Sequence, residues 1–412
     1  MTTHASDSDS YDTVIVGAGI VGSALAAFLS EDEDSGRILL IDRSISQVLG
    51  STAYAPGFLG QFNESPVLTR LAVESLGEYE NFPDIFCRAG GLELARTKDG
   101  VRMLEERCEK ARGAGLQARM LEKEEAEGVV PEFVSRESFT RALYFATDGV
   151  ADPEKLCLAF RQKARERGVQ MLEAEVEGLE IIEGVVRGVR TDGDRILKGQ
   201  RVILATGIWT SLLTQSALDI HVPVVPVAHP YVYTPGKDRS PQTPFCRWPE
   251  DHVYARDHGD CYGIGSYDHS PMLVHSPGTT GSEPWTNADF APVIEKAVKA
   301  KIAVDAELSK LTNLNSSAGL KKVNGVFSVT PDNLPLLGRV PGAKGLWLAA
   351  AIWITHAAGS ARLLARVMRG EEDDWEMARA LDPARFGDGN KKGLEALALR
   401  QYNDIYRSEL AE

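Results

Sequence analysis

The sequence predicts an α/β protein in which a nucleotide-binding domain is joined to a second, largely antiparallel α+β domain. Three observations point to this fold: a β-branched run that becomes a glycine-rich turn at residues 13–22, an apolar run at residues 37–42 that ends in an acid, and short alternating strands after residue 222. With 412 residues, of which 43% are apolar and 25% charged, the chain has the size and composition of a soluble globular protein with two or three domains.

The glycine-rich turn is typical of a Rossmann-type strand–turn–helix unit that binds a dinucleotide. The letters TVIVGAGIVG place Gly17, Gly19 and Gly22 in a Gly-x-Gly-x-x-Gly motif. Gly17 permits the turn, Gly19 lets the backbone approach a pyrophosphate, and Gly22 lets the helix lie close to the strand. Asp42 ends the next strand about 20 residues later, where an acid binds a ribose hydroxyl. An ordinary glycine turn is the alternative, which the combination of strand, helix and Asp42 disfavours.

The patterns between these strands and residue 221 predict one loop, three helices and further strands. The small and hydroxyl-bearing residues 50–57 form either a surface loop or a loop that passes along a cofactor. The expected helices cover residues 68–79, 101–127 and 153–168, and Asp152 is the expected N-cap of the third. The expected strands cover residues 90–94, 171–176, 186–191 and 201–207, the last of which returns the chain to the first sheet.

The remainder of the chain first builds the second domain and then returns to the first. One amphipathic helix, at about residues 290–304, interrupts the antiparallel strands of the second domain, while a strand at 345–351 and a helix at 356–368 that ends at Gly370 rejoin the first sheet. The predicted nucleotide-binding domain is therefore discontinuous. It comprises residues 11–85, 145–220 and 328–380, the second domain comprises 86–144 and 221–327, and residues 381–412 form a charged surface tail.

Composition excludes several classes of function. A net charge of −14 repels nucleic acid and anionic membranes, so neither is expected as a partner. The sequence contains no run of 18 apolar residues, the length that a membrane-spanning helix requires. Residues 1–11 do not resemble a signal or transit peptide, and the last residues match no retention signal, so we expect a cytoplasmic protein. The five cysteines are widely spaced and the eight histidines lack a helical pair spacing, so no metal site is expected.

Nearly the whole chain resembles the amine-oxidising branch of the D-amino acid oxidase superfamily, and most closely the flavin half of dimethylglycine oxidase and of the dimethylglycine and sarcosine dehydrogenases. Beside the turn at residues 17–22 and Asp42, the resemblance rests on GSTAYAPG at 50–57, PVAHPYV at 226–232, VYARDHGD at 253–260 with GIGSY at 263–267, and TPD at 330–332 with WITHAAG at 353–359.

This resemblance implies FAD as the cofactor. It places the adenosine end at the glycine turn and Asp42, and it lets the helix that starts after Thr355 point its N–H groups at the pyrimidine edge of the flavin, where reduction develops negative charge. His356 either faces the flavin or only caps that helix. The residues implied to contact FAD are Gly17, Gly19, Gly22, Asp42, Arg43, Ser51, Thr52, Tyr54, Ala55, Val176, Thr206, Gly207, Thr355 and His356.

Two departures from the family pattern qualify the resemblance. In the dimethylglycine and sarcosine enzymes, a histidine aligned with Tyr54 carries the flavin covalently. In monomeric sarcosine oxidases and fructosyl amino acid oxidases, the anchor is a cysteine that aligns with Gly325. We therefore expect FAD without a covalent link. The tetrahydrofolate-binding half of the dimethylglycine enzymes has no counterpart in this sequence, so no folate domain is expected.

The resemblance predicts an FAD-dependent oxidoreductase that oxidises a C–N bond of a small secondary or tertiary amine, similar to an N-methyl amino acid. His229 and Tyr254 align with active-site residues that position the substrate and set its protonation. Without the resemblance, we would interpret His229 as a core histidine whose hydrogen bonds are satisfied within the protein, and Tyr254 as an aromatic side chain packed at the end of a strand. A primary amino acid or a specialised-pathway amine is the alternative substrate, and a non-catalytic structural flavoprotein is the alternative class. Either oxygen or another electron acceptor reoxidises the flavin.

Overall fold

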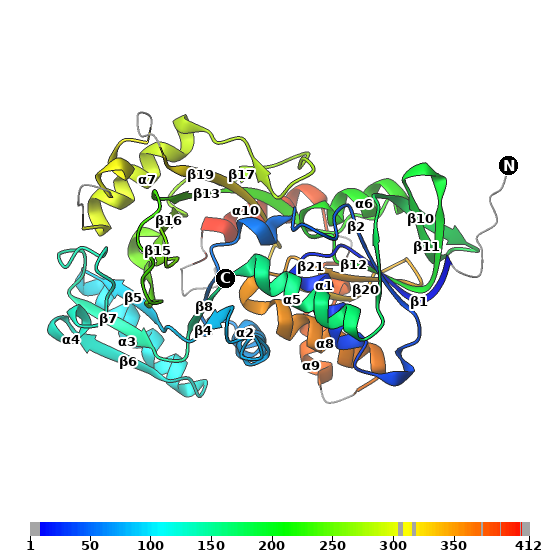
Figure 1. The fold of residues 1–412 in the computed structure, drawn as a ribbon, viewed down its shortest axis with the longest axis horizontal. Helices are drawn as coiled ribbons and strands as arrows, with labels where there is room; N and C mark the ends of the chain where they lie inside the picture. Colours follow the sequence, from blue (N-terminus) through cyan, green and yellow to red (C-terminus); the bar gives the residue numbers. More distant parts are fainter. Residues whose placement is uncertain are drawn as a thin grey trace.

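The computed structural model describes residues 9–303, 308–314, 319–371, 374–387, 389–403 and 405. Two large sheets form its frame, one at each end of the elongated molecule (Figure 1). This arrangement confirms the predicted α/β fold with two sheets of different character. The expectations about a leader or retention signal concern residues 1–8 and 406–412, which lie outside the described residues.

The first sheet has eight strands and carries the glycine-rich turn. Its parallel centre consists of β2 (Ile38–Asp42), β1 (Ser10–Val16), β12 (Ile196–Leu204) and β21 (Leu346–Ala350). Because helices cover the sheet, β2 and β21 are nearly continuous apolar runs, and the last residues of β1 and β12 are buried as well. The other strands are β9 (Gln170–Glu173), β10 (Val176–Ile182), β11 (Val185–Thr191) and β20 (Leu336–Arg339).

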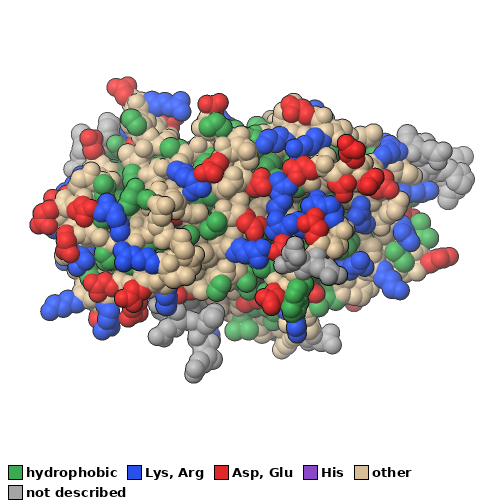
Figure 2. Space-filling model, turned by 90° about the horizontal axis from the view of Figure 1, so that it is seen from below, with side chains coloured by type: hydrophobic (Ala, Val, Ile, Leu, Met, Phe, Trp, Pro, Cys, Tyr) green, Lys and Arg blue, Asp and Glu red, His purple; other side chains and the backbone are tan. Residues whose placement is uncertain are grey.

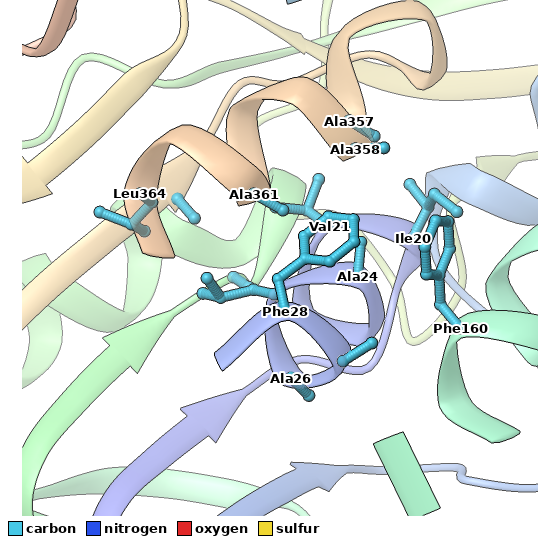
Figure 3. Packing of buried hydrophobic residues seen from close by; sticks show 14 of the residues in the cluster. Ile20, Val21, Ala24, Ala26, Phe28, Phe160, Ala357, Ala358, Ala361 and Leu364 are labelled. Atoms are coloured by element: carbon cyan, nitrogen blue, oxygen red, sulfur yellow. The ribbon is translucent and has the colours of Figure 1, made fainter. Parts of the chain in front are cut away.

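Helix α1 (Ile20–Leu29) is enclosed between α5 (Pro153–Glu166) and α8 (Ala357–Arg369), and all its residues are buried. Figure 3 shows Val21, Ala24 and Phe28 of α1 facing the alanines at the start of α8. Small side chains let the two helices approach closely, so α8 is held directly beside the glycine-rich turn. The edge of the Phe28 ring meets Phe160 of α5 with 5.6 Å between the ring centroids.

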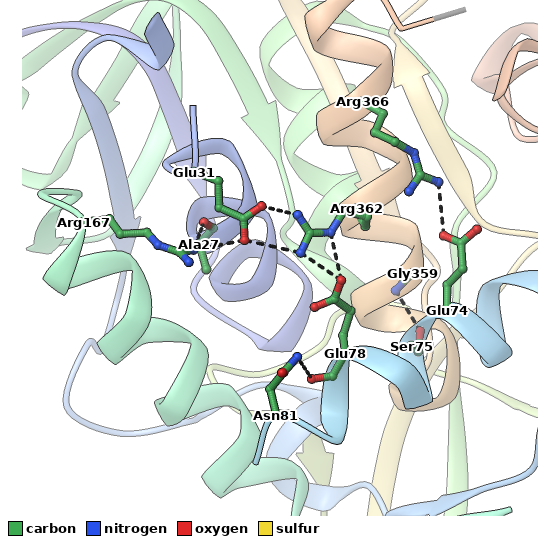
Figure 4. Close-up of polar contacts among 10 residues, drawn as sticks. All are labelled: Ala27, Glu31, Glu74, Ser75, Glu78, Asn81, Arg167, Gly359, Arg362 and Arg366. Atoms are coloured by element: carbon green, nitrogen blue, oxygen red, sulfur yellow. Dashed lines mark hydrogen bonds and ion pairs between the residues drawn. The ribbon is translucent and has the colours of Figure 1, made fainter. Parts of the chain in front are cut away.

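Polar contacts hold helix α8 from its outer side. Arg362 of α8 pairs with Glu31 after α1 and with Glu78 of α2 (Pro66–Tyr79) (Figure 4). The Ser75 hydroxyl of α2 accepts a hydrogen bond from the backbone N–H of Gly359 at 2.8 Å. The position and orientation of α8 are therefore set by polar contacts with α2 and with the segment after α1.

The second sheet has ten strands and is antiparallel except where β14 runs parallel to β5. Its strands in spatial order are β18 (Ser282–Glu283), β19 (Lys321–Val329), β13 (Val225–Tyr233), β16 (Tyr262–Ser266), β15 (Val253–Asp257), β14 (Phe245–Trp248), β5 (Gly91–Ala95), β7 (Arg141–Phe145) and β6 (Ala118–Glu122), with β17 (Met272–Leu273) beside β13. A small third sheet joins the two large ones through β3 (Phe58–Leu59), β8 (Gly149–Ala151) and β4 (Phe86–Cys87).

The remaining helices lie mainly around the second sheet and at the chain end. They are α3 (Lys98–Gly113), α4 (Lys123–Glu127), α6 (Thr210–Leu218), α7 (Asn287–Lys301), α9 (Trp375–Ala380) and α10 (Lys391–Asn403). The N-cap prediction is confirmed, because Asp152 accepts a hydrogen bond from the backbone N–H of Lys155. The exact boundaries of the two predicted domains remain a prediction.

Three expectations about elements are wrong in part. The charged stretch 101–127 is not one helix, because β6 separates α3 from α4 and pairs with β7. The stretch 171–176 holds the end of β9 and the start of β10, which belong to opposite edges of the first sheet. The tail 381–412 is not only a surface segment, because Ala398 and Tyr402 of α10 are fully buried against the second sheet. Tertiary packing decides all three, and charge patterns along the chain do not report it.

On the face drawn in Figure 2, Lys and Arg side chains are interspersed with Asp and Glu side chains. Among the described helices, none combines the length and the apolar character that crossing a lipid bilayer requires. Within the same residues, His, Cys, Asp and Glu side chains do not gather into a group that could ligate a metal ion.

Candidate active site

A cavity of about 690 Å³ runs between the two sheets, and both contribute to its walls. Its size lies within the range of ligand sites in proteins. All but one of the residues expected to contact a cofactor or substrate line this cavity. The residues that line it are Gly17, Gly19, Asp42, Arg43, Ser51, Thr52, Tyr54, Ala55, Val176, Thr206, Gly207, His229, Tyr254, Thr355 and His356. Gly22 lies behind the wall.

Close backbone approach explains the glycines of the turn. Gly17 has φ of +104°, and a Cβ there would lie 2.4 Å from the carbonyl oxygen of Ala205 at the end of β12. A Cβ on Gly22 would lie 1.9 Å from the carbonyl oxygen of Gly17. Side chains at these positions would push the turn away from its two neighbours, so Gly22 shapes the site without lining it.

Side chains hold the turn from both sides. The Asp42 carboxylate accepts a hydrogen bond from the backbone N–H of Ala18 at 2.6 Å, and Thr52 Oγ1 accepts one from Ile20 N–H at 3.2 Å. A carboxylate can accept further hydrogen bonds, so Asp42 can also bind a hydroxyl in the cavity. Behind the turn, the buried Arg161 of α5 donates to the carbonyl of Ala18 at 2.9 Å.

Another part of the cavity wall comes from β13, β19 and the residues just before α8, where Trp353 Nε1 donates a hydrogen bond to the carbonyl oxygen of Ser328. Tyr54 and Gly325, which align with the two covalent anchor positions, are neighbours there: a Cβ on Gly325 would lie 3.5 Å from Cβ of Tyr54. Thr355 and His356 lie in the short 3-10 turn (Ile354–His356) that precedes α8. Burial lowers the pKa of His356 to about 4, so its imidazole is neutral at neutral pH.

His229 and Tyr254, from neighbouring parts of the second sheet, are hydrogen-bonded to each other. Nε2 of His229 lies 2.6 Å from the Tyr254 hydroxyl, and both residues are buried. A Cβ on Gly265 of β16 would lie 2.3 Å from the Tyr254 hydroxyl, so this glycine makes room for the ring. Burial, together with the nearby His269, holds the pKa of His229 well below its usual range. His229 is therefore neutral, and one of its ring nitrogens can accept a hydrogen bond.

A buried ionic group borders the cavity at the second sheet. Arg107 of α3 binds Glu93 of β5 through two hydrogen bonds of 2.8 and 3.0 Å, and Arg247 of β14 lies 3.2 Å from the same carboxylate. Burial raises the pKa of the adjacent Asp148 to about 7, although Arg247 and the Gln61 N–H act in the opposite direction. Arg247 also lines the cavity.

Three residues of this site escaped sequence reasoning: Arg161, Arg247 and Tyr402. The Tyr402 hydroxyl lies 2.7 Å from Nδ1 of His229. The arginines occur in segments without a motif, and Tyr402 belongs to the stretch read as a surface tail. Its only signal is the spacing of four between Ala398 and Tyr402, which places them on one face of a helix.

With this geometry established, known proteins provide an independent comparison. The profile described as FAD dependent oxidoreductase matches residues 12–367. The mitochondrial dimethylglycine dehydrogenase of Rattus norvegicus is 25% identical over 400 residues, which are 92% of this chain and 45% of that protein. The glycine oxidase of Pseudomonas aeruginosa is 28% identical over 397 residues, covering 90% of this chain and 97% of that protein.

A solved structure shares the fold. The crystal structure of L-proline dehydrogenase from P. horikoshii superimposes with a TM-score of 0.76 at 22% identity, covering 92% of this chain and 99% of that one. The chain spans less than half the length of the dimethylglycine dehydrogenase that it matches, whereas it spans nearly all of the glycine oxidase.

Proposed function

Because the chain belongs to the family of FAD-dependent oxidoreductases, we propose that it oxidises a C–N bond of a small secondary or tertiary amine, similar to an N-methyl amino acid. When bound, FAD accepts a hydride from the carbon next to the amine nitrogen. Water then hydrolyses the iminium product of the substrate. The observation that carries the proposal is the hydrogen-bonded pair of His229 and Tyr254 at the wall of the cavity.

The residues present fit FAD at both ends of the cavity. The proposed adenosine end is the glycine turn, where Gly17 brings the backbone close and Asp42 retains acceptor capacity. The proposed flavin end is the start of α8, whose N–H groups favour negative charge. We propose that no covalent link forms, because Tyr54 and Gly325 stand where the relatives carry their anchors.

His229 and Tyr254 supply proton handling. An amine of the proposed class arrives mainly as an ammonium ion, and its lone pair must be freed before the C–H bond can break. The neutral His229 accepts the Tyr254 hydroxyl proton, and the Tyr254 oxygen then accepts one from the substrate nitrogen. These two residues of the cavity wall thereby take up the proton that the substrate nitrogen must lose before the amine is oxidised.

A primary amino acid is the second candidate substrate. The match to glycine oxidase over nearly the full length of both chains favours it. A structural flavoprotein without activity is the third reading, and the acid–base pair at the cavity wall argues against it. Cytoplasmic location, the electron acceptor and the lack of a folate domain remain predictions from the sequence.

Anaerobic reduction of the bound flavin by a panel of amines tests the proposal. We expect N-methyl amino acids to bleach the flavin spectrum and to yield formaldehyde and the demethylated amine in equal amounts. Ammonia together with a keto acid would instead establish the primary-amine reading. An unchanged spectrum with every amine would leave only the structural reading. Repeating the reaction in air then shows whether oxygen reoxidises the flavin.

A further inference from the structure

The hydrogen bond between Tyr254 and His229 is the first of a continuous series that leaves the cavity. Nδ1 of His229 lies 2.7 Å from the hydroxyl of Tyr402, and this hydroxyl lies 2.6 Å from Nε2 of His269. Nδ1 of His269 lies 2.8 Å from the carbonyl oxygen of Ser270. Side chains from β15, β13 and α10 and the loop after β16 therefore form one chain of short hydrogen bonds.

The carbonyl at the outer end sets the direction of every bond in the series. A carbonyl oxygen only accepts, so His269 carries its proton on Nδ1 and its Nε2 accepts the Tyr402 proton. The Tyr402 oxygen then accepts from Nδ1–H of His229. Nε2 of His229 is left to accept the Tyr254 proton. All hydroxyl and imidazole protons thus point outward, from the cavity toward Ser270.

The two ends of the series lie in different surroundings. Tyr254 lines the large cavity, whereas His269 is partly exposed and lines a separate surface recess together with Asp268 and Asn403. Burial lowers the pKa of His269, while the Ser270 carbonyl and the carboxylates of Asp268 and Asp289 act to raise it. Asp268 is also paired with Lys296.

At the inner histidine, none of the carboxylates in the described part of the chain offsets the burial. The rings against His229 belong to Tyr254, Tyr267, Phe327, His269 and Tyr402, and all of them are neutral. A positive charge is therefore better stabilised at the outer histidine, beside carboxylates and solvent, than at the buried one.

We propose that Tyr254, His229, Tyr402 and His269 form a proton path from the amine site to the surface recess, with His269 as its exit. The inference rests on the proposed function, because the amine substrate is the source of the proton. Tyr254 takes a proton from the substrate nitrogen as its own passes to Nε2 of His229. Nδ1 of His229 then releases its proton to Tyr402, whose hydroxyl proton passes to Nε2 of His269.

The transfer is balanced at each step. Tyr254, His229 and Tyr402 each gain one N–H or O–H bond and lose one, the substrate nitrogen loses one N–H bond, and no electron changes hands. His269 alone gains a net proton, which it returns to water in the recess. The reverse rotation of the hydroxyls and return of the imidazoles to their first tautomers restore the path.

A purely structural role for Tyr402 is the competing explanation. Its hydroxyl lies 3.4 Å from the carbonyl of Ala228, and its ring packs on Phe327 at 5.6 Å between centroids, so it also fastens α10 to the second sheet. Tyr402→Phe keeps the ring and removes only the hydroxyl. Tyr233→Phe is the matched control, because it removes a tyrosine hydroxyl from the strand of His229 but outside the path.

The kinetic test compares flavin reduction in the FAD-loaded variants across pH. Tyr402→Phe and His269→Ala are expected to slow reduction by about 10²-fold and to change its pH profile, whereas Tyr233→Phe keeps both. Imidazole added to His269→Ala enters the recess and restores the rate, but it does not restore Tyr402→Phe. Wild-type rates and pH profiles in both path variants would overturn the path and leave the proposed function intact.

A second readout does not depend on turnover. Nitrogen-15 NMR of histidine-labelled protein is expected to show His229 and His269 both protonated on Nδ1 and bare on Nε2. In Tyr402→Phe, His229 loses this tautomer preference while its folding is unchanged. A proton on Nε2 of His229 in the wild type would overturn the path. If no amine bleaches the wild-type flavin, the proposed function fails, and the tautomers alone then decide the path.

Discussion

The hydroxyl of Tyr402 lies 2.7 Å from Nδ1 of His229, a residue 173 positions earlier in the chain. This contact joins the C-terminal helix α10 to strand β13 at the side of His229 that faces away from Tyr254. The orientation of the imidazole at the cavity wall is therefore held by a helix outside residues 12–367, the part of the chain that the family profile matches.

Replacing His229 by Ala, or Tyr254 by Phe, is expected to slow flavin reduction by an amine substrate by about 10²- to 10⁴-fold, because proton transfer from the amine is lost. The FAD content, read from the flavin absorbance, should not change. The exposed His275 provides the control: His275→Ala should keep the wild-type rate. A wild-type reduction rate in His229→Ala would remove the role assigned to this residue.

Gly17→Ala is expected to abolish FAD binding, because the new Cβ would lie 2.4 Å from the Ala205 carbonyl oxygen in a backbone conformation that favours glycine. Gly77→Ala in α2 is the matched change, since a Cβ there meets nothing within 4 Å. In a helix interior this control should gain up to about 1 kcal/mol of stability. The flavin absorbance after gel filtration and a thermal melt measure both effects. Stoichiometric FAD in Gly17→Ala would contradict the placement of the turn.

FAD is expected to be released by acid precipitation, because neither Tyr54 nor Gly325 is a histidine or cysteine anchor. The supernatant should be yellow and the protein pellet colourless. Peptide mass spectrometry provides the counter-test. A flavin mass on the peptide that contains Tyr54 would mean that the chain uses a different covalent anchor.

Glu93→Gln is expected to destabilise the fold by about 3–5 kcal/mol, because it leaves the buried guanidinium groups of Arg107 and Arg247 without their shared carboxylate. Asp99→Asn removes the partner of Arg102 in an exposed ion pair and should cost less than about 1 kcal/mol. Urea unfolding at neutral pH measures both. Similar losses in the two variants would show that burial does not set the strength of the Glu93 pair.

Stability is expected to depend on the protonation of Asp148. Its pKa is raised by burial to about 7 in the folded chain, above the value of about 3.9 in an unfolded one. Its contribution is therefore complete below about pH 4 and is lost as pH rises through about 7. Asp148→Asn, which can still accept from the Gln61 N–H, should gain stability relative to the wild type over that interval. If the difference in unfolding free energy between Asp148→Asn and the wild type does not change with pH over that interval, the shifted pKa of Asp148 is contradicted.

The sequence by itself determined the features that depend on residues close together in the chain. The glycine turn, the strand that ends in Asp42 and the N-cap Asp152 are local, because backbone conformation and hydrogen bonding within a few residues decide them. The motifs around His229 and Tyr254 also marked the residues that β13 and β15 bring to the cavity wall.

The tertiary structure alone decided which distant residues complete the site. Arg161 reaches the turn from a helix 143 positions away, and Tyr402 reaches His229 only because α10 docks on β13 and β19. No pattern in either segment identifies the partner of the contact, because that partner is set by the packing of whole elements. The charges of residues 391–403 indicated a solvated helix, while the buried face of that helix depends on the sheet against which it lies.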